Sequence, residues 1–138
     1  MVEHEHVRTV RRIYDAFVAG DLPAVLPLMT DDMEMIPPVS SGTTAVAGWG
    51  RTWRGRDEAA QYLGTLATAL EFQTFEADEF IADRDQVAVL GHERCVVRAT
   101  GLAVEIRWVQ IFTFRQGLVC RHREYSDTAA WEAAFASR

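Results

Sequence analysis

The chain has 138 residues, enough for one domain with its own hydrophobic core, and its 49% apolar and 25% charged residues are ordinary values for a soluble protein. It contains no apolar run near the roughly 20 residues that a membrane-spanning helix needs, and its polar, charged start does not resemble a signal peptide. The net charge is −6 and the 14 basic residues are scattered arginines, which argues against binding to nucleic acid or to an anionic membrane. We therefore expect one cytoplasmic domain over residues 1–138.

The first part of the chain predicts two helices and a strand. Residues 3–19 form a helix because apolar residues recur at three- and four-residue spacing, and Gly20 ends it. Asp21 can cap a second helix over residues 22–29, which carries a proline in its first turn. A strand is expected over residues 33–36.

A long connection and a third helix come next. Residues 37–52 are rich in proline, serine and glycine, so we expect a loop long enough to cover a pocket. The third helix opens at Arg56 or Asp57. The apolar stripe that it is expected to bury consists of Ala60, Leu63, Leu66, Ala67 and Leu70.

The second half of the chain predicts antiparallel strands followed by a short helix. Turn residues such as Gln116-Gly117 separate its apolar segments. Asp127 can cap a closing helix over residues 128–136. Helices followed by a run of antiparallel strands are typical of an α+β fold. The expected strands cover residues 72–82, 86–99, 104–114 and 118–125.

Three motifs carry a resemblance to a known family. They are Ala19-Gly20-Asp21-Leu22 after the first helix, Thr52-Trp53-Arg54-Gly55-Arg56-Asp57 before the third, and Arg123-Glu124-Tyr125-Ser126-Asp127-Thr128 before the last. The chain resembles the SnoaL-like polyketide cyclases, which belong to the superfamily of ketosteroid isomerase, limonene epoxide hydrolase and nuclear transport factor 2. The resemblance implies an α+β fold in which a cone-shaped, curved, mixed or antiparallel sheet wraps around three N-terminal helices, with a short C-terminal helix and a deep apolar pocket. That superfamily contains both enzymes and binding proteins, so the fold alone does not settle the function.

The catalytic residues of ketosteroid isomerase do not carry over to this chain. That enzyme uses a tyrosine and a buried protonated aspartate to polarise a carbonyl, while a second aspartate moves the proton. The tyrosine position holds Ile13, the proton-moving position holds Pro37 and the buried acid position holds Gln110. Tyr14 is one residue away from the tyrosine position, about 100° round the helix, and is a poor substitute.

Glu124 is the candidate general base that the cyclase resemblance implies. In the cyclases one carboxylate on the last strand removes an acidic proton from a polyketide carbon before an aldol closure, and Glu124 stands at that position. Gln110 stands where many relatives carry a histidine. The epoxide hydrolase resemblance matches Glu124 to an acid and Arg94 to an arginine, but places Val96 where a second aspartate is needed.

The period of two along a strand assigns side chains to faces. With Gln110 toward the pocket, its apolar neighbours at even positions follow it inward; a core glutamine bonded to backbone is the alternative. On the last strand Glu124 shares a face with Cys120 and His122, opposite Val119, Arg121, Arg123 and Tyr125. The alternative for Glu124 is an ion pair, either buried with Arg94 or outward with a cross-strand arginine. The even positions expected to face inward with Gln110 are Val104, Ile106, Trp108, Phe112 and Phe114.

The strand over residues 86–99 has two mixed faces. We favour His92 and Arg94 pointing inward, where the arginine would supply a fixed positive charge to an enolate or carboxylate. Glu93, Cys95 and Val97 would then point outward. The alternative places Arg94 outward at a dimer interface. Both Cys95 and Cys120 are interpreted as buried reduced thiols.

The candidate site therefore combines polar groups with an apolar lining. Trp49 and Trp53 are expected to cover the pocket mouth, with core filling as the alternative. We expect no cofactor and no metal site. The candidate catalytic residues are Glu124, Arg94, His92, Gln110 and His122, and the candidate substrate-binding residues are Tyr14, Phe17, Met33, Met35, Trp49, Trp53, Trp108 and Phe112.

Two functions from different classes fit this sequence. One is a cofactor-free enzyme that transfers protons on a hydrophobic, polyketide-like or cyclic ketone, by aldol cyclisation or isomerisation. The other is a non-catalytic protein that binds a small apolar ligand. A homodimer through the outer sheet face is expected in either case, because that face would be unusually apolar. Its apolar residues are Val109, Ile111, Val119 and Tyr125.

Overall fold

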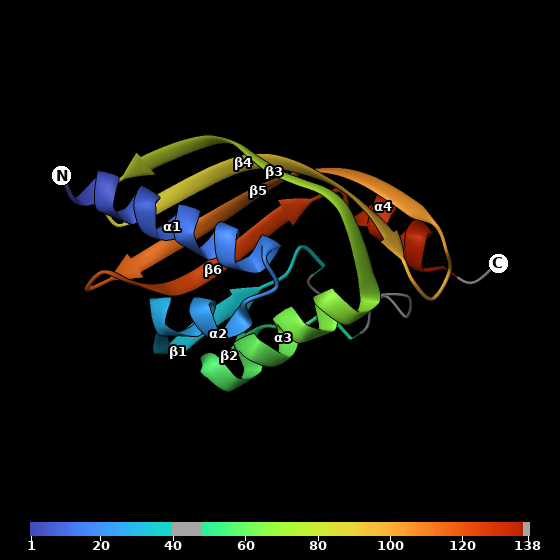
Figure 1. The fold of residues 1–138 in the computed structure, drawn as a ribbon, viewed down its shortest axis with the longest axis horizontal. Helices are drawn as coiled ribbons and strands as arrows, with labels where there is room; N and C mark the ends of the chain where they lie inside the picture. Colours follow the sequence, from blue (N-terminus) through green and yellow to red (C-terminus); the bar gives the residue numbers. More distant parts are fainter. Residues whose placement is uncertain (40–47, 137–138) are drawn as a thin grey trace.

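The computed structural model describes residues 1–39 and 48–136. Over these residues, helices pack against one curved, open, six-stranded sheet, which confirms the expected α+β fold (Figure 1). The elements in chain order are α1 (Val2–Val18), α2 (Leu22–Val25), the 3-10 helix η1 (Leu26–Leu28), β1 (Met29–Ile36), β2 (Trp53–Arg54), α3 (Gly55–Ala69), β3 (Leu70–Asp83), β4 (Gln86–Val97), β5 (Ala103–Arg115), β6 (Leu118–Ser126) and α4 (Thr128–Phe135).

The sheet has the strand order β2-β1-β6-β5-β4-β3. The pair β1 and β6 is parallel, and the other neighbouring pairs are antiparallel. Figure 1 shows the long strands curving past α1, α2 and α3, while α4 lies at the end of the sheet away from the N-terminus. The sheet and these helices enclose one hydrophobic core, whose members come from every layer.

The inner face of β5 is the most regular part of that core. Val104, Ile106, Trp108, Gln110, Phe112 and Phe114 are all buried, as the period of two predicts. The intervening charged residues Glu105, Arg107 and Arg115 are exposed. Gln110 therefore faces the interior with aromatic neighbours on both sides along the strand.

A register shift moves part of β6 away from the simple alternation. Phe114 pairs with Val119, whereas Thr113 pairs with Arg121, so β6 carries an extra residue there. Val119 is consequently fully buried and Cys120 only half-buried. The expectation that Val119 faces outward and Cys120 inward is wrong, because alternation holds only where no residue is inserted.

The helices begin and end close to their predicted bounds, with two differences. Asp21 caps α2 and Asp127 caps α4, each by accepting a hydrogen bond from a backbone amide three residues later. The second predicted helix is split into α2 and η1. Helix α3 buries Ala59, Tyr62 and Leu63, and the expected stripe is rotated, so that Ala67 is exposed. The core therefore accommodates Tyr62, which the predicted apolar stripe did not include.

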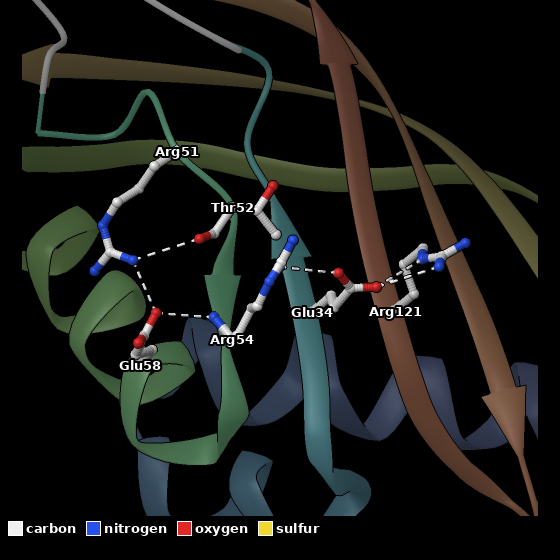
Figure 2. Close-up of polar contacts among 6 residues, drawn as sticks. All are labelled: Glu34, Arg51, Thr52, Arg54, Glu58 and Arg121. Carbon is white, nitrogen blue, oxygen red and sulfur yellow. Dashed lines mark hydrogen bonds and ion pairs between the residues drawn. The ribbon is translucent and has the colours of Figure 1, made fainter.

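The short strand β2 fastens the beginning of α3 to the sheet (Figure 2). Glu34 on β1 lies between two arginines: Arg54 Nη1 is 3.3 Å from one carboxyl oxygen and Arg121 Nη2 is 3.2 Å from the other. Glu58 on α3 accepts from the Arg54 backbone amide at 2.9 Å and from Arg51 at 2.8 Å. These pairs lie at the solvent-exposed edge of the sheet, where water and salt screen them, so they orient the edge more than they stabilise it.

Part of the predicted 37–52 loop lies outside the described residues, namely 40–47, and with it the expectation that this segment covers a pocket. On either side of it, Val39 and Trp49 are buried in the core. Among the described helices, none has the length and apolar composition needed to cross a membrane.

Candidate active site

An apolar cavity of about 70 Å³ lies between the helices and the inner face of the sheet. Among the described residues its wall is largely aromatic and aliphatic, and it includes two carboxyl groups, one amide and one imidazole. A few convergent polar groups in an apolar wall are typical of small-molecule sites. The lining residues are Ile13, Tyr14, Phe17, Val25, Met29, Met35, Pro38, Trp49, Tyr62, Leu63, Leu66, Leu70, Phe72, Phe75, Glu93, Gln110, Phe112, His122, Glu124 and Trp131.

The Glu124 carboxyl group is held at both of its oxygens. Gln110 Nε2 donates to Oε1 at 2.9 Å, and the Ser126 hydroxyl donates to Oε2 at 3.0 Å. Ser126 Oγ in turn accepts a hydrogen bond from the Trp131 indole at 3.1 Å. The strands bring these groups together, because Gln110 on β5 is the direct cross-strand partner of Glu124 on β6.

Two further donors orient the Gln110 amide. The Tyr14 hydroxyl donates to Gln110 Oε1 at 2.7 Å, and His122 Nε2 lies 3.1 Å from the same oxygen. With its oxygen occupied by these two groups, the amide presents its nitrogen to Glu124. The neutral imidazole donates through Nε2, and among the described residues its buried Nδ1 has no hydrogen-bond partner. Tyr14 and His122 thus hold Gln110, and Gln110 holds Glu124.

Burial dominates the titration of these groups. Desolvation raises the pKa of Glu124, and the hydrogen bonds from Gln110 and Ser126 oppose that rise. Desolvation lowers the pKa of His122 to about 4, so the imidazole is neutral near pH 7. Desolvation, and then the charge of Glu124, raise the pKa of Tyr14, which keeps its hydroxyl protonated as a donor. The site therefore contains a strengthened base among neutral donors.

Glu93 is the acidic lining residue that sequence reasoning missed, and Tyr62, Phe72, Phe75 and Trp131 are aromatic lining residues that it also missed. Glu93 lies on β4, is 5% exposed and shares the cavity with Glu124. Desolvation first, and then the charge of Glu124, raise its pKa to about 8, while the neighbouring Cys95 thiol opposes the rise. The available signal was the set of odd positions on this strand, where Val87, Val89 and Val97 make that face the more apolar one.

The sequence and the fold agree with a known family. A SnoaL-like domain matches residues 10–122, which is most of the chain. The chain belongs to the SnoaL-like domain family. An NTF2-like protein from Burkholderia xenovorans LB400 is 30% identical and has a TM-score of 0.84, covering 97% of this chain and 98% of that one.

Two more distant relatives of this SnoaL-like protein also match it over nearly the whole length of both chains. An uncharacterised protein of Mycobacterium tuberculosis is 28% identical, over 99% of this chain and all of its own length. A proposed SnoaL-like polyketide cyclase from Jannaschia sp. CCS1 is 20% identical with a TM-score of 0.81, covering 99% of this chain and 95% of that one. At 20% identity, the likeness to the Jannaschia protein shows a shared fold alone.

The structure of the SnoaL-like protein brings most of the candidate residues to one cavity. Glu124, Gln110 and His122 converge there, and Gln110 is hydrogen-bonded to both of the others. The candidate lining residues found in the wall are Tyr14, Phe17, Met35, Trp49 and Phe112.

The expected inward direction of His92 and Arg94 is wrong. His92 is exposed and its Nδ1 lies 2.7 Å from Asp78. Arg94 lies on the same outer face, where it pairs with Glu105 at 3.0 Å and bonds to Gln73. The register with β5 sends the odd positions of β4 inward, so Glu93, Cys95 and Val97 are the buried residues. Neither basic group lines the cavity with Glu124.

Three other candidates are buried but stand behind the cavity wall. Met33 is fully buried in the core. Trp53 packs on Tyr62, with ring centroids 5.4 Å apart, and donates to the Trp49 carbonyl at 3.4 Å. Trp108 stacks on Phe75 at 5.2 Å. They fill the core and support lining residues, which was the alternative interpretation of Trp53.

Proposed function

We propose that this protein is a cofactor-free enzyme that transfers protons on a hydrophobic, polyketide-like or cyclic ketone, with Glu124 as the general base. The observation that carries the proposal is the Glu124 carboxyl group, which lines the cavity and is held at both oxygens by Gln110 and Ser126. A held carboxylate with a raised pKa is a better base near neutral pH than an exposed one. The family resemblance to polyketide cyclases supports the same reaction class.

The reaction begins when Glu124 takes the proton from a carbon next to a carbonyl group. The C–H bond breaks, its electron pair passes to the carbonyl as an enolate, and the proton remains on the carboxyl group. In an aldol cyclisation the enolate carbon forms a bond to the carbon of a second carbonyl and the first carbonyl re-forms. The oxygen of the second carbonyl then takes the proton from the Glu124 carboxyl group, which restores the base. In an isomerisation Glu124 returns the proton to a different carbon. Gln110, Tyr14, His122 and Ser126 are positioning residues, because their hydrogen bonds orient the base.

A second function, the binding of a small apolar ligand without chemistry, is favoured by a different observation. The lining is mostly aromatic and aliphatic, and the network of Gln110 bonds is satisfied within the protein itself. Epoxide opening is not proposed, because the matching arginine, Arg94, lies on the outer face.

Hydrogen exchange at carbon tests the proposal without knowledge of the natural substrate. The test compound is 2-tetralone, a small cyclic ketone, in buffered D₂O, with loss of its α-proton signals followed by NMR. The wild-type protein should accelerate exchange over buffer, and Glu124→Gln should reduce that acceleration by roughly 10²- to 10⁴-fold. Glu71→Gln, which alters an exposed acid on β3, is the matched control and should exchange like the wild type.

The outcomes separate the two functions. Equal acceleration by the wild type and Glu124→Gln contradicts the role of this base. Binding of the ketone, seen as line broadening, without any acceleration in the wild type favours the binding protein.

A further inference from the structure

Glu93 is a buried acid that the proposed reaction does not use. Its side chain is on the inner face of β4, between its cross-strand partners Phe75 on β3 and Ile106 on β5. Only 5% of the residue is exposed to solvent, yet it forms part of the cavity wall. Within residues 1–39 and 48–136, no arginine or histidine forms an ion pair with its carboxyl group. The Cys95 thiol on the same face of β4 lowers its pKa, but less than burial raises it.

The cavity wall contains acids without a compensating cation. Glu93 and Glu124 line it together, and none of the described lining residues is an arginine. The lining imidazole, His122, is neutral near pH 7 because burial lowers its pKa to about 4. Because burial and the charge of Glu124 raise the pKa of Glu93 to about 8, Glu93 keeps its proton near pH 7 when the cavity holds no cation. A positively charged ligand group would stabilise the carboxylate form of Glu93 and would reduce its repulsion with Glu124.

Aromatic rings supply the rest of such a site. Phe72, Phe75, Tyr62 and Trp131 line the same cavity. The faces of aromatic rings attract cations, by about 0.5–2 kcal/mol for each well-placed pair. Tyr62 lies close enough to both acids that, after burial, their charges raise the pKa of its hydroxyl. The net charge of −6 also favours the approach of a cation over that of an anion.

We propose that the cavity binds a hydrophobic amine, with its ammonium group on the Glu93 carboxylate and its apolar part among the aromatic rings. Neutral molecules of the same shape bind more weakly, and anions more weakly still. This charge preference goes beyond the proposed reaction, because it holds whichever chemistry Glu124 performs. A ketone substrate that also carries an amine would satisfy both proposals.

Three probes of one shape and different charge test the preference. They are phenethylamine, 2-phenylethanol and phenylacetate, titrated into the protein at pH 8.5, where most of the Glu93 carboxyl group is ionised, with calorimetry or protein NMR. The amine should bind at least tenfold more tightly than the alcohol, and phenylacetate should bind more weakly than either. The wild-type series alone overturns the proposal if the alcohol binds as tightly as the amine, or if none of the three binds.

Two variants locate the charge that anchors the amine. Glu93→Gln keeps the size of the side chain and should reduce the affinity for phenethylamine to that for 2-phenylethanol. Glu71→Gln, as the matched control, should keep the wild-type order. An unchanged amine preference in Glu93→Gln, or its loss in Glu124→Gln alone, contradicts Glu93 as the anchor. Circular dichroism verifies that each variant is folded. If a variant is unfolded, the binding series of the wild-type protein alone tests the proposal.

Failure of the proposed reaction has a different signature. Absence of tetralone exchange contradicts proton transfer by Glu124 and does not affect the charge series. If the cavity prefers the neutral probe while Glu124-dependent exchange of tetralone is intact, the amine proposal is contradicted and the proposed reaction is not.

Discussion

Glu93 and His122 are buried titratable groups whose pKa values move in opposite directions. Glu93 rises from 4.5 to about 8, because of burial and the charge of Glu124, so the folded state holds its proton more tightly than the unfolded state. His122 falls from 6.5 to about 4, because of burial, so the folded state holds its proton less tightly. By linkage, Glu93 makes stability fall as pH rises from 4.5 to 8, and His122 makes it fall as pH drops from 6.5 to 4.

We expect a stability maximum in the window where the two trends oppose each other, between pH 4.5 and 6.5. Above it, the proton on Glu93 is lost, and the free energy of unfolding should drop by about 2 kcal/mol between pH 6.5 and pH 8. Urea unfolding at those two pH values measures the drop. Glu93→Gln should lose most of it, since the variant has no proton to release, while Glu71→Gln should retain it. A full drop in Glu93→Gln would assign the effect to other groups, Glu124 among them.

Strand β4 depends on Gly91, because the Trp108 side chain of the neighbouring strand β5 lies across it there. Gly91 is the cross-strand partner of Trp108, and a Cβ atom at Gly91 would lie 2.3 Å from the Trp108 ring and 2.4 Å from the Glu76 backbone oxygen. Neither obstacle is the end of a flexible side chain. The indole lies across the strand there and stacks on Phe75, which lines the cavity.

We therefore expect Gly91→Ala to lower the free energy of unfolding by about 1–3 kcal/mol or more, because overpacking forces the indole and the strand apart. Thermal unfolding followed by tryptophan fluorescence measures it. Gly64→Ala is the control: Gly64 lies within α3, nothing lies within 4 Å of its added Cβ, and the change should be neutral or stabilising by up to about 1 kcal/mol. Comparable stability of the two variants would mean that the close contact with Trp108 is not maintained.

The outer face of the sheet carries adjoining apolar residues. Tyr125 is 57% exposed, and Val109 and Ile111 beside it are only half-buried. In the register of β5 and β6, Tyr125 pairs with Val109 and Arg123 with Ile111, so the apolar groups adjoin. Val119, which was expected among them, belongs to the core.

We propose a homodimer through this face and expect light scattering coupled to gel filtration to give twice the chain mass at micromolar concentration. Tyr125→Glu should shift the protein toward the monomer, since it places a charge in the apolar patch. Val18→Glu changes a residue that is 64% exposed at the end of α1 and should leave the dimer intact. A wild-type protein that runs as a monomer, or a Tyr125→Glu variant that stays dimeric, contradicts this interface.

Local rules account for much that was predictable from the sequence. Helix α1 ends just before Gly20, and α2 and α4 begin directly after the capping residues Asp21 and Asp127, because capping depends on neighbouring residues alone. On β5 the apolar and polar residues alternate so strictly that the side of Gln110 followed from the period of two. Glu124 was found on the cavity side because β6 alternates regularly beyond its inserted residue. The α+β layout follows from the order of these elements.

Long-range pairing determined the rest. On β4 both faces mix polar and apolar residues, and periodicity shows which residues share a face without showing which face is inside. Register with β5 turned Glu93 inward and His92 and Arg94 outward. The inserted residue in β6 and the rotation of α3 likewise arise from packing between segments distant in the chain. The alternation along one strand shows which side chains share a face. Only the packed sheet shows which of the two faces points into the core.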